Sequence, residues 1–73
     1  MKIGSAIKDY REGLGMNQSD LASRSGINQG YLSSIESGSR EPSLNMIGRI
    51  SHSLGLTRRE LLDLGIKYNN SKF

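Results

Sequence analysis

The sequence predicts an all-α domain, a compact bundle of about five short helices on one core. Its 73 residues allow a single small domain. Apolar residues recur at helical spacing along most of the chain, and clusters of turn-forming residues separate these segments. The pattern contains neither strand-like alternation nor internal repeats. We expect the domain to cover residues 1–65 and a tail without usable periodicity to cover residues 66–73.

The first expected helix carries one apolar stripe and ends near Leu14. Because successive residues lie about 100° apart around a helix, positions i, i+4, i+7 and i+11 share one side. The residues at these positions are Ile3, Ile7, Tyr10 and Leu14. Gly13 and Gly15 then favour the end of the helix.

A second, short helix is expected to begin at Gln18. Asn17 is a good N-cap, and Asp20 at the third helical position can answer it and favours the positive end of the helix dipole. The helix is expected to end after about two turns at Ser25 and Gly26, because glycine readily adopts the left-handed conformation.

A third helix follows almost at once, so two short helices meet across a tight turn. Only Ile27 and Asn28 separate Gly26 from the helical pattern of residues 29–36, and Asn28 is its expected N-cap. The segment 37–43 is rich in turn formers and contains the only proline. It therefore predicts a loop.

A fourth and a fifth helix complete the expected bundle. Ser43 caps the fourth helix and Gly55 ends it. Its expected buried stripe consists of Leu44, Ile47, Ile50 and Leu54. Thr57 and Glu60 form a capping box that opens the fifth helix. The apolar residues of this short helix are Leu61, Leu62 and Leu64, and we expect it to end at Gly65.

Composition excludes several classes of function. There are no cysteines and one histidine, so thiolate metal sites, disulfides and cysteine nucleophiles are excluded. No acid–base pair or activated nucleophile can be assembled, so we expect neither an enzyme nor a cofactor, metal or small-molecule ligand. No apolar run is long enough for a membrane span, and we expect a cytoplasmic protein. The net charge of +3 is compatible with an anionic partner but points to it only weakly.

The outward face of the third helix is polar, small and uncharged. It consists of Gln29, Gly30, Ser33 and Ser34, opposite an apolar side. Amides and hydroxyls can donate and accept hydrogen bonds, and glutamine can pair with adenine through two bonds in the major groove. A plain solvated face is about as good an explanation of this helix taken alone.

The register of residues 18–35 favours a helix-turn-helix. Small Ala22 stands where two helices cross closely, and Gly26 stands in the turn. Apolar residues occupy the other required places, namely Leu21, Ile27, Leu32 and Ile35.

With these residues in place, the chain resembles the Xre/Cro/C1-type helix-turn-helix regulators of phages and bacteria. The resemblance covers Ile3 to Leu64. Its most specific segments are residues 16–22, 31–38, 40–43 and 54–56. It implies a lambda-repressor-like DNA-binding domain, with the helix-turn-helix formed by the second and third helices.

The resemblance also implies roles for individual residues. It assigns base reading to Gln29, Gly30, Ser33 and Ser34. It assigns phosphate contacts to Asn17, Gln18, Asn28, Ser37, Ser39 and Arg40. It implies that Gln18 braces Gln29, and that Arg11 and Glu36 form an ion pair between the first and third helices.

Two residues depart from the family pattern. Ser25 stands where an apolar residue is usual, so the second helix is expected to pack less firmly. Gly30 replaces what is often a side chain at a base-reading position, which leaves that base to be read through water, through shape or not at all. The formal charge from Asn17 to Arg40 is zero, so the DNA prediction rests on the register and not on charge.

Two functions from different classes remain open. The first is a sequence-specific regulator of transcription, a repressor that binds an inverted-repeat operator in double-stranded DNA as a homodimer, weakly associated without DNA. Its expected dimer surface includes Leu56, Leu64, Ile66 and Met46. The alternative is a protein-interaction module of the same fold, such as an antitoxin or anti-regulator. Exposed apolar residues on the third helix would have favoured that alternative.

Overall fold

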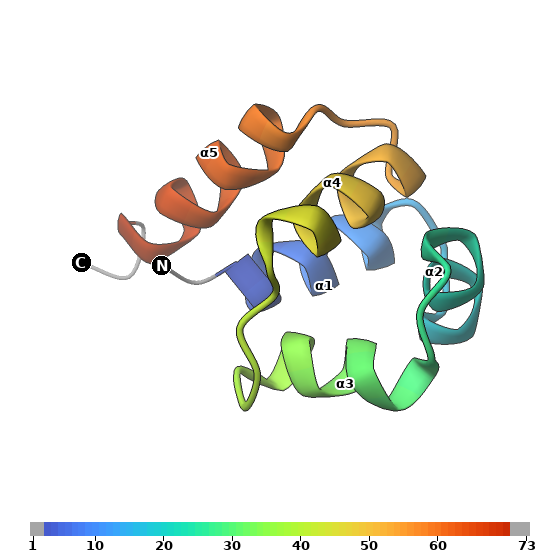
Figure 1. Cartoon of the computed structure of the whole chain (residues 1–73). Helices are drawn as coiled ribbons and strands as arrows, with labels where there is room; N and C mark the ends of the chain where they lie inside the picture. The colour runs from blue at the N-terminus through green and yellow to red at the C-terminus, as the bar shows by residue number, and fades with distance from the viewer. Residues whose placement is uncertain (1–2, 71–73) are drawn as a thin grey trace.

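The chain folds into five α-helices, which confirms the predicted all-α class. A computed structural model describes residues 3–70 (Figure 1). The helices are α1 (Ile3–Gly13), α2 (Gln18–Ser25), α3 (Gln29–Ser37), α4 (Leu44–Ser53) and α5 (Arg58–Asn70). None of the helices in this part of the chain combines the length and the apolar character needed to cross a membrane.

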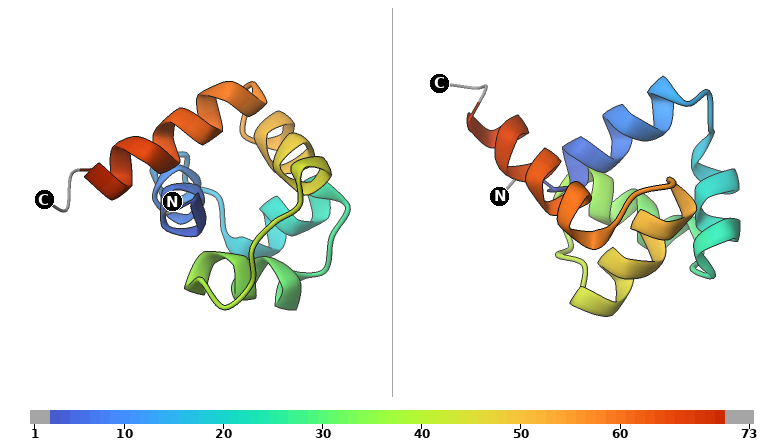
Figure 2. Two further views of the ribbon diagram at one scale, coloured as in Figure 1. Left: turned by 60° about the vertical axis from the view of Figure 1, so that its left-hand side comes forward. Right: turned by 90° about the horizontal axis from the view of Figure 1, so that it is seen from above.

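The five helices pack in a closed ring. The main contacts run from α1 to α3, from α3 to α2, from α2 to α4, from α4 to α5, and from α5 back to α1. Figure 1 shows α1 between α3 below and α4 and α5 above, and Figure 2 shows the same arrangement from two other directions. Each helix is therefore held by two neighbours, and α3 keeps one side free.

Side-chain caps explain where the helices begin. The side-chain oxygens of Asn17, Asn28 and Ser43 accept hydrogen bonds from backbone N–H groups three residues later, at 2.8, 2.7 and 3.1 Å. Thr57 and Glu60 form the reciprocal pair of a capping box, at 2.8 and 3.1 Å. The predicted N-caps and the predicted capping box are confirmed.

The turn between α2 and α3 depends on Gly26. This residue has φ 70°, the left-handed region that other residues rarely adopt. The next residue, Ile27, donates its backbone N–H to the carbonyl of Ala22 at 3.0 Å. Together these features end α2 and turn the chain within three residues into α3.

The core draws one large, fully buried side chain or more from every helix. These side chains are Ile7, Leu21, Leu32, Ile35, Ile50 and Leu61. Two apolar residues expected in buried stripes are instead exposed, Leu14 by 52% and Leu44 by 70%. Leu14 lies beyond the last residue of α1, and Leu44 lies in the first turn of α4, about 120° around the helix from Ile50.

The polar residue expected to loosen α2 has a partner. Ser25 is only 4% exposed, and its hydroxyl donates to the hydroxyl of Ser53 on α4 at 3.0 Å. The Ser53 hydroxyl in turn donates to the carbonyl of Arg49 at 3.0 Å. The α2–α4 contact therefore accommodates a serine at an apolar position by supplying a hydrogen bond.

Helix α5 is longer than the sequence indicated. The expectation that it ends at Gly65 and gives way to an irregular tail is wrong for residues 66–70, which continue the helix. Gly65 is buried within α5, which packs against α1. Tertiary packing thus outweighs the low helix propensity of this glycine. Residues 71–73 of the expected tail lie outside the described residues.

Helices α1 and α3 approach each other closely at Gly4. A Cβ atom at this position would lie 1.9 Å from the carbonyl oxygen of Ile35 and 3.2 Å from the Cα atom of Glu36. No side chain fits there without displacement of the backbone. Gly4 therefore limits the distance between α1 and the end of α3, a role that the sequence pattern did not indicate.

Candidate nucleic-acid interface

The free side of α3 presents the four residues expected to read bases. Gln29, Gly30 and Ser33 are exposed and Ser34 is half-buried. On the opposite side of the helix, Leu32 and Ile35 are 0% and 1% exposed and anchor it in the core. The helix therefore holds its polar side outward, along the lower edge of the molecule in Figure 1.

Gly30 and Ser34 are linked along this side. The Ser34 hydroxyl donates to the carbonyl of Gly30 at 3.1 Å, so its proton is engaged and its oxygen remains an acceptor. A Cβ atom at Gly30 would meet only the Asn28 side-chain oxygen, at 3.4 Å. Packing therefore does not require glycine at position 30. The absence of a side chain at Gly30 leaves the helix backbone accessible at that point.

Beneath α3, Arg11 and Glu36 form a buried ion pair. The Arg11 Nε and Nη2 atoms donate to the two carboxylate oxygens of Glu36, each at 2.9 Å. The two side chains are 8% and 3% exposed. Arg11 Nη1 also donates to the carbonyl of Met16 at 2.8 Å. The hydrogen bond to Glu36 raises the pKa of the Arg11 guanidinium, against the opposing effect of burial, so Arg11 remains cationic.

Gln18 connects this ion pair to the surface of α3. Its Nε2 atom donates to Glu36 Oε1 at 3.1 Å, and its Oε1 atom accepts from Gln29 Nε2 at 3.4 Å. The contact between Gln18 and Gln29 is the one that the family resemblance implied. The additional bond to Glu36 was not expected, and the sequence gives no signal for it beyond the presence of these residues.

The two asparagines expected at phosphates already serve as caps. Asn17 and Asn28 use their side-chain oxygens to accept from the backbone of α2 and α3. Both are exposed, at the N-termini of the two helices of the helix-turn-helix. An anion there would be bound by the side-chain NH2 groups and by free backbone N–H groups of the first turn.

The segment after α3 is tied back to the helix. The Ser37 and Ser39 hydroxyls donate to the carbonyl of Ser34 at 3.1 and 3.2 Å. The backbone N–H of Arg40 donates to the same carbonyl at 3.1 Å. The loop predicted after α3 is present, and hydrogen bonds to the last turn of α3 hold its backbone at Arg40. The two serine hydroxyls are also turned toward the helix.

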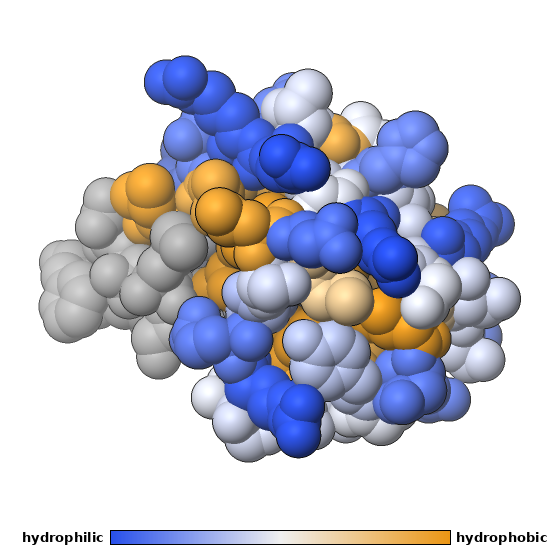
Figure 3. Space-filling view, viewed as in Figure 1, coloured by the Kyte–Doolittle hydropathy of each residue, from blue (hydrophilic) through white to orange (hydrophobic). Residues whose placement is uncertain are grey.

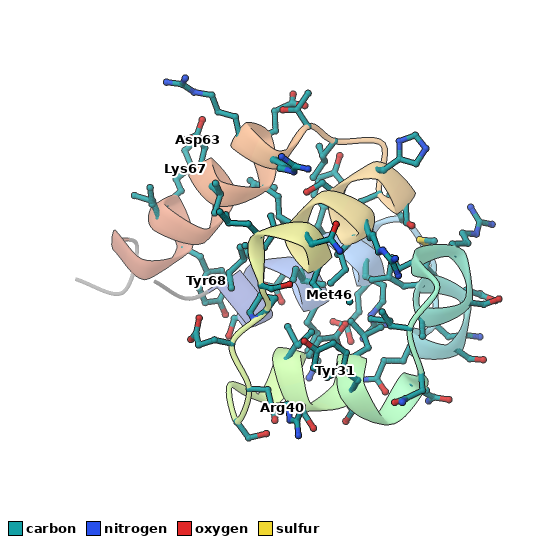
Figure 4. All side chains as sticks on the ribbon, viewed as in Figure 1. Tyr31, Arg40, Met46, Asp63, Lys67 and Tyr68 are labelled. Carbon is teal, nitrogen blue, oxygen red and sulfur yellow. The ribbon has the colours of Figure 1, made fainter. Side chains whose placement is uncertain are left out.

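Arg40 lies over the ring of Tyr31. Its guanidinium carbon is 5.5 Å from the ring centroid, a cation–π contact. In Figure 4, Tyr31 and Arg40 lie together beside α3, below Met46 of α4. A shallow hollow runs between the two helices here, lined by Asn28, Gly30, Tyr31, Ser34, Arg40 and Met46. Met46 was expected on a dimer surface. The sequence pattern did not indicate that Met46 and Tyr31 are neighbours of the base-reading face.

Comparison with known proteins shows the family of the chain. The family model HTH_3, described as helix-turn-helix, matches residues 7–61. The uncharacterised HTH-type transcriptional regulator y4dJ of Sinorhizobium fredii is 35% identical over 60 residues, which are 82% of this chain and 78% of y4dJ. The HTH-type transcriptional regulator SinR of Bacillus subtilis is 39% identical over 62 residues, 84% of this chain and 56% of SinR. The chain thus spans little more than half of SinR.

Solved structures share the fold. The clp gene regulator ClgR of Corynebacterium glutamicum superposes with a TM-score of 0.91 at 27% identity, covering 97% of this chain and 76% of that one. SinR in complex with DNA gives a TM-score of 0.76 at 38% identity, covering 82% of this chain and 97% of that one. SinR in complex with the SinI protein gives a TM-score of 0.78 at 39% identity, covering 84% of this chain and 60% of that one.

The matched residues 7–61 contain the whole of α2 and α3 and most of the core. The family is one of DNA-binding regulators and not of enzymes. The chain therefore belongs to the HTH_3 family of helix-turn-helix transcriptional regulators, of the Xre/Cro/C1 type.

Proposed function

We propose that this regulator is a repressor that reads a specific operator by seating α3 in the major groove of double-stranded DNA. The observation that carries the proposal is the free side of α3, where exposed Gln29 is held by Gln18. A helix fits the major groove, and an amide beside hydroxyl and glycine positions can approach base edges closely. Such a regulator works in the compartment that holds the DNA, in agreement with the cytoplasmic location expected from the sequence.

The proposed interface has two kinds of contact, those to base edges and those to phosphates. Gln29, Gly30, Ser33 and Ser34 face the bases, and Gln29 supplies most of the selectivity. Asn17, Gln18, Asn28 and Arg40 flank them and contact phosphates. The Ser37 and Ser39 hydroxyls contact phosphates only by giving up their bonds to the Ser34 carbonyl. Arg40 supplies the cation of this set, and the backbone N–H groups at the starts of α2 and α3 add neutral donors.

The operator is an inverted repeat bound by two copies of the chain. One short helix reads few base pairs, so two copies placed one DNA turn apart, about 34–36 Å, give useful selectivity. The surface for the second copy is the α1–α5 side, where a groove is lined by Ala6, Asp9, Tyr10, Leu64, Lys67 and Tyr68. Ile66 beside it is 50% exposed. Hydrophobic side chains gather over α5 in Figure 3.

The alternative, a module whose main partner is a protein, is less well supported. Such a module would present apolar side chains on the outward side of α3. The exposed residues there are an amide, a glycine and a serine, namely Gln29, Gly30 and Ser33. Exposed Leu44 and Leu14 lie outside α3.

The test begins with selection of bound duplexes from a random pool, followed by salt titrations of two alanine variants on the selected and a scrambled duplex. Gln29→Ala is expected to weaken the selected duplex by about 1–3 kcal/mol and to leave the scrambled duplex nearly unchanged. Arg40→Ala is expected to weaken both duplexes by a similar factor and to lower the slope of log affinity against log salt by about one.

The opposite pattern would overturn the proposal. If Arg40→Ala relaxed the sequence preference while Gln29→Ala weakened both duplexes equally, α3 would not sit in the major groove as described. Selected sites without an inverted repeat, in complexes that contain a single chain, would remove the dimer from the proposal and leave the base-reading helix.

A further inference from the structure

A continuous line of hydrogen bonds joins the buried core to the base-reading side of α3. It runs from Arg11 to Glu36 at 2.9 Å, from Gln18 to Glu36 at 3.1 Å, and from Gln29 to Gln18 at 3.4 Å. Exposure rises along the same line, from buried Glu36 through half-buried Gln18 to exposed Gln29. The shortest and most buried of these bonds lie at the core end of the line. The core therefore sets the orientation of the Gln18 and Gln29 side chains.

Glu36 fixes the orientation of the Gln18 amide. A glutamine amide has an oxygen that accepts and an NH2 group that donates, and it can turn by half a rotation to exchange them. The Glu36 carboxylate is paired with the Arg11 cation, and both of its oxygens are acceptors. Only the NH2 end of Gln18 can face such a group without repulsion. The oxygen of Gln18 therefore faces Gln29.

Gln18 in turn fixes the orientation of Gln29. The Gln18 oxygen can only accept, so it requires the NH2 end of Gln29. One N–H of Gln29 is then engaged by the protein. One N–H donor and the oxygen acceptor are left for a base. A glutamine amide that is free to turn could exchange the positions of its donor and its acceptor, and would therefore fix no order of the two.

This fixed pair of groups suits one purine. In the major groove adenine presents an acceptor and a donor, whereas guanine presents two acceptors. A fixed amide matches adenine with both groups. Opposite guanine, the fixed Gln29 amide would place its oxygen against an acceptor of the base. To avoid this, the Gln29 amide must turn, which breaks its bond to Gln18 and leaves the Gln18 oxygen without a donor.

We propose that Glu36 is a positioning residue for base selection: through Gln18 it fixes the orientation of the Gln29 amide, whose remaining N–H donor and oxygen acceptor favour adenine over guanine opposite Gln29. This inference rests on the proposed DNA-reading function. It gives the buried carboxylate a part in specificity in addition to its ion pair with Arg11.

The test removes the carboxylate without leaving a lone buried charge. The double variant Arg11→Met/Glu36→Met replaces the ion pair by apolar side chains, a change that other buried pairs tolerate. The matched control is Arg11→Lys, which keeps the Glu36 acceptor while disturbing the pair. Folding of each variant is checked by circular dichroism at the temperature of the binding measurement.

Binding is measured on two selected duplexes that differ only at the base pair opposite Gln29, A·T or G·C. That position is the one at which Gln29→Ala loses its preference. Because both duplexes share their phosphate contacts, the ratio of affinities reports base selection alone. We expect the wild type and Arg11→Lys to prefer adenine, and the double variant to lower the ratio by about 2- to 12-fold, the worth of one net hydrogen bond.

A second readout needs no DNA. The side-chain NH2 protons of Gln18, assigned by their loss in Gln18→Met, are expected to show one downfield-shifted proton in the wild type and in Arg11→Lys. The double variant is expected to lose this shift, because the carboxylate acceptor is gone.

Two results would overturn the inference while leaving the proposed function intact. The first is an unchanged ratio of affinities in the double variant. The second is a wild-type preference for guanine opposite Gln29. A failure of the proposed function itself is distinguishable, since the wild type would then select no duplex from the random pool.

Discussion

Two contacts of the helix ring bury polar side chains in different ways. Between α1 and α3, Arg11 and Glu36 are both charged, and each is 7% exposed. Between α2 and α4, the neutral hydroxyl of buried Ser25 donates to the neutral hydroxyl of half-buried Ser53. The first contact also includes a close backbone approach, at Gly4.

The difference between the contacts lies in what remains after one partner is lost. A lone charge in the core keeps its full desolvation cost, whereas a lone hydroxyl costs less and can turn to another acceptor. The α1–α3 contact is therefore expected to tolerate few single substitutions. The α2–α4 contact is expected to tolerate most small ones.

The largest effect is expected from Arg11→Met. It leaves the Glu36 carboxylate buried with only the Gln18 amide as a charge-stabilising partner, and should lower the free energy of unfolding by about 3–5 kcal/mol. Chemical denaturation measures the loss. The double variant Arg11→Met/Glu36→Met serves as the control and should recover most of it. A single variant as stable as the wild type would show that these groups are solvated.

The next effect is expected from Gly4→Ala. The added Cβ atom meets the backbone carbonyl of Ile35 at 1.9 Å, so α1 and α3 must separate, at a cost of about 3 kcal/mol. The matched control is Gly13→Ala, in the same helix, where a Cβ atom meets nothing within 4 Å. Thermal unfolding of the two variants compares them. Equal midpoints would mean that the close approach at Gly4 contributes little.

The smallest effect is expected from Ser25→Ala. Removal of the Ser25 hydroxyl leaves the Ser53 hydroxyl bonded to the carbonyl of Arg49, and alanine favours the helix. The free energy of unfolding should therefore fall by no more than about 1 kcal/mol. The measurement is the same denaturation experiment. A loss as large as that of Arg11→Met would erase the distinction between the two contacts.

The sequence predicted features that depend on local chemistry. The caps at Asn17, Asn28 and Ser43 and the turn at Gly26 follow from the preferences of single residue types, and all four are present. The helix-turn-helix register followed from apolar spacing together with the family resemblance. These signals extend over a few residues, which is why one sequence suffices to detect them.

Features that depend on distant packing were missed. The extension of α5 past Gly65 requires the surface of α1, and the role of Gly4 requires the carbonyl of Ile35, 31 residues away in the chain. The bond between Gln18 and Glu36 likewise joins two helices whose relative placement the sequence does not give.

The attachment of Arg40 to α3 has a consequence for the speed and fidelity of recognition. Because its backbone is bonded to Ser34 and its side chain rests on Tyr31, the cation and the amide of Gln29 belong to one rigid body. Ordering a free arginine on binding would cost about 0.5–1.5 kcal/mol of conformational entropy. Here much of that ordering precedes the encounter. In the proposed complex, the fixed spacing between Arg40 and Gln29 would disfavour sites in which a phosphate and a base edge do not match that spacing.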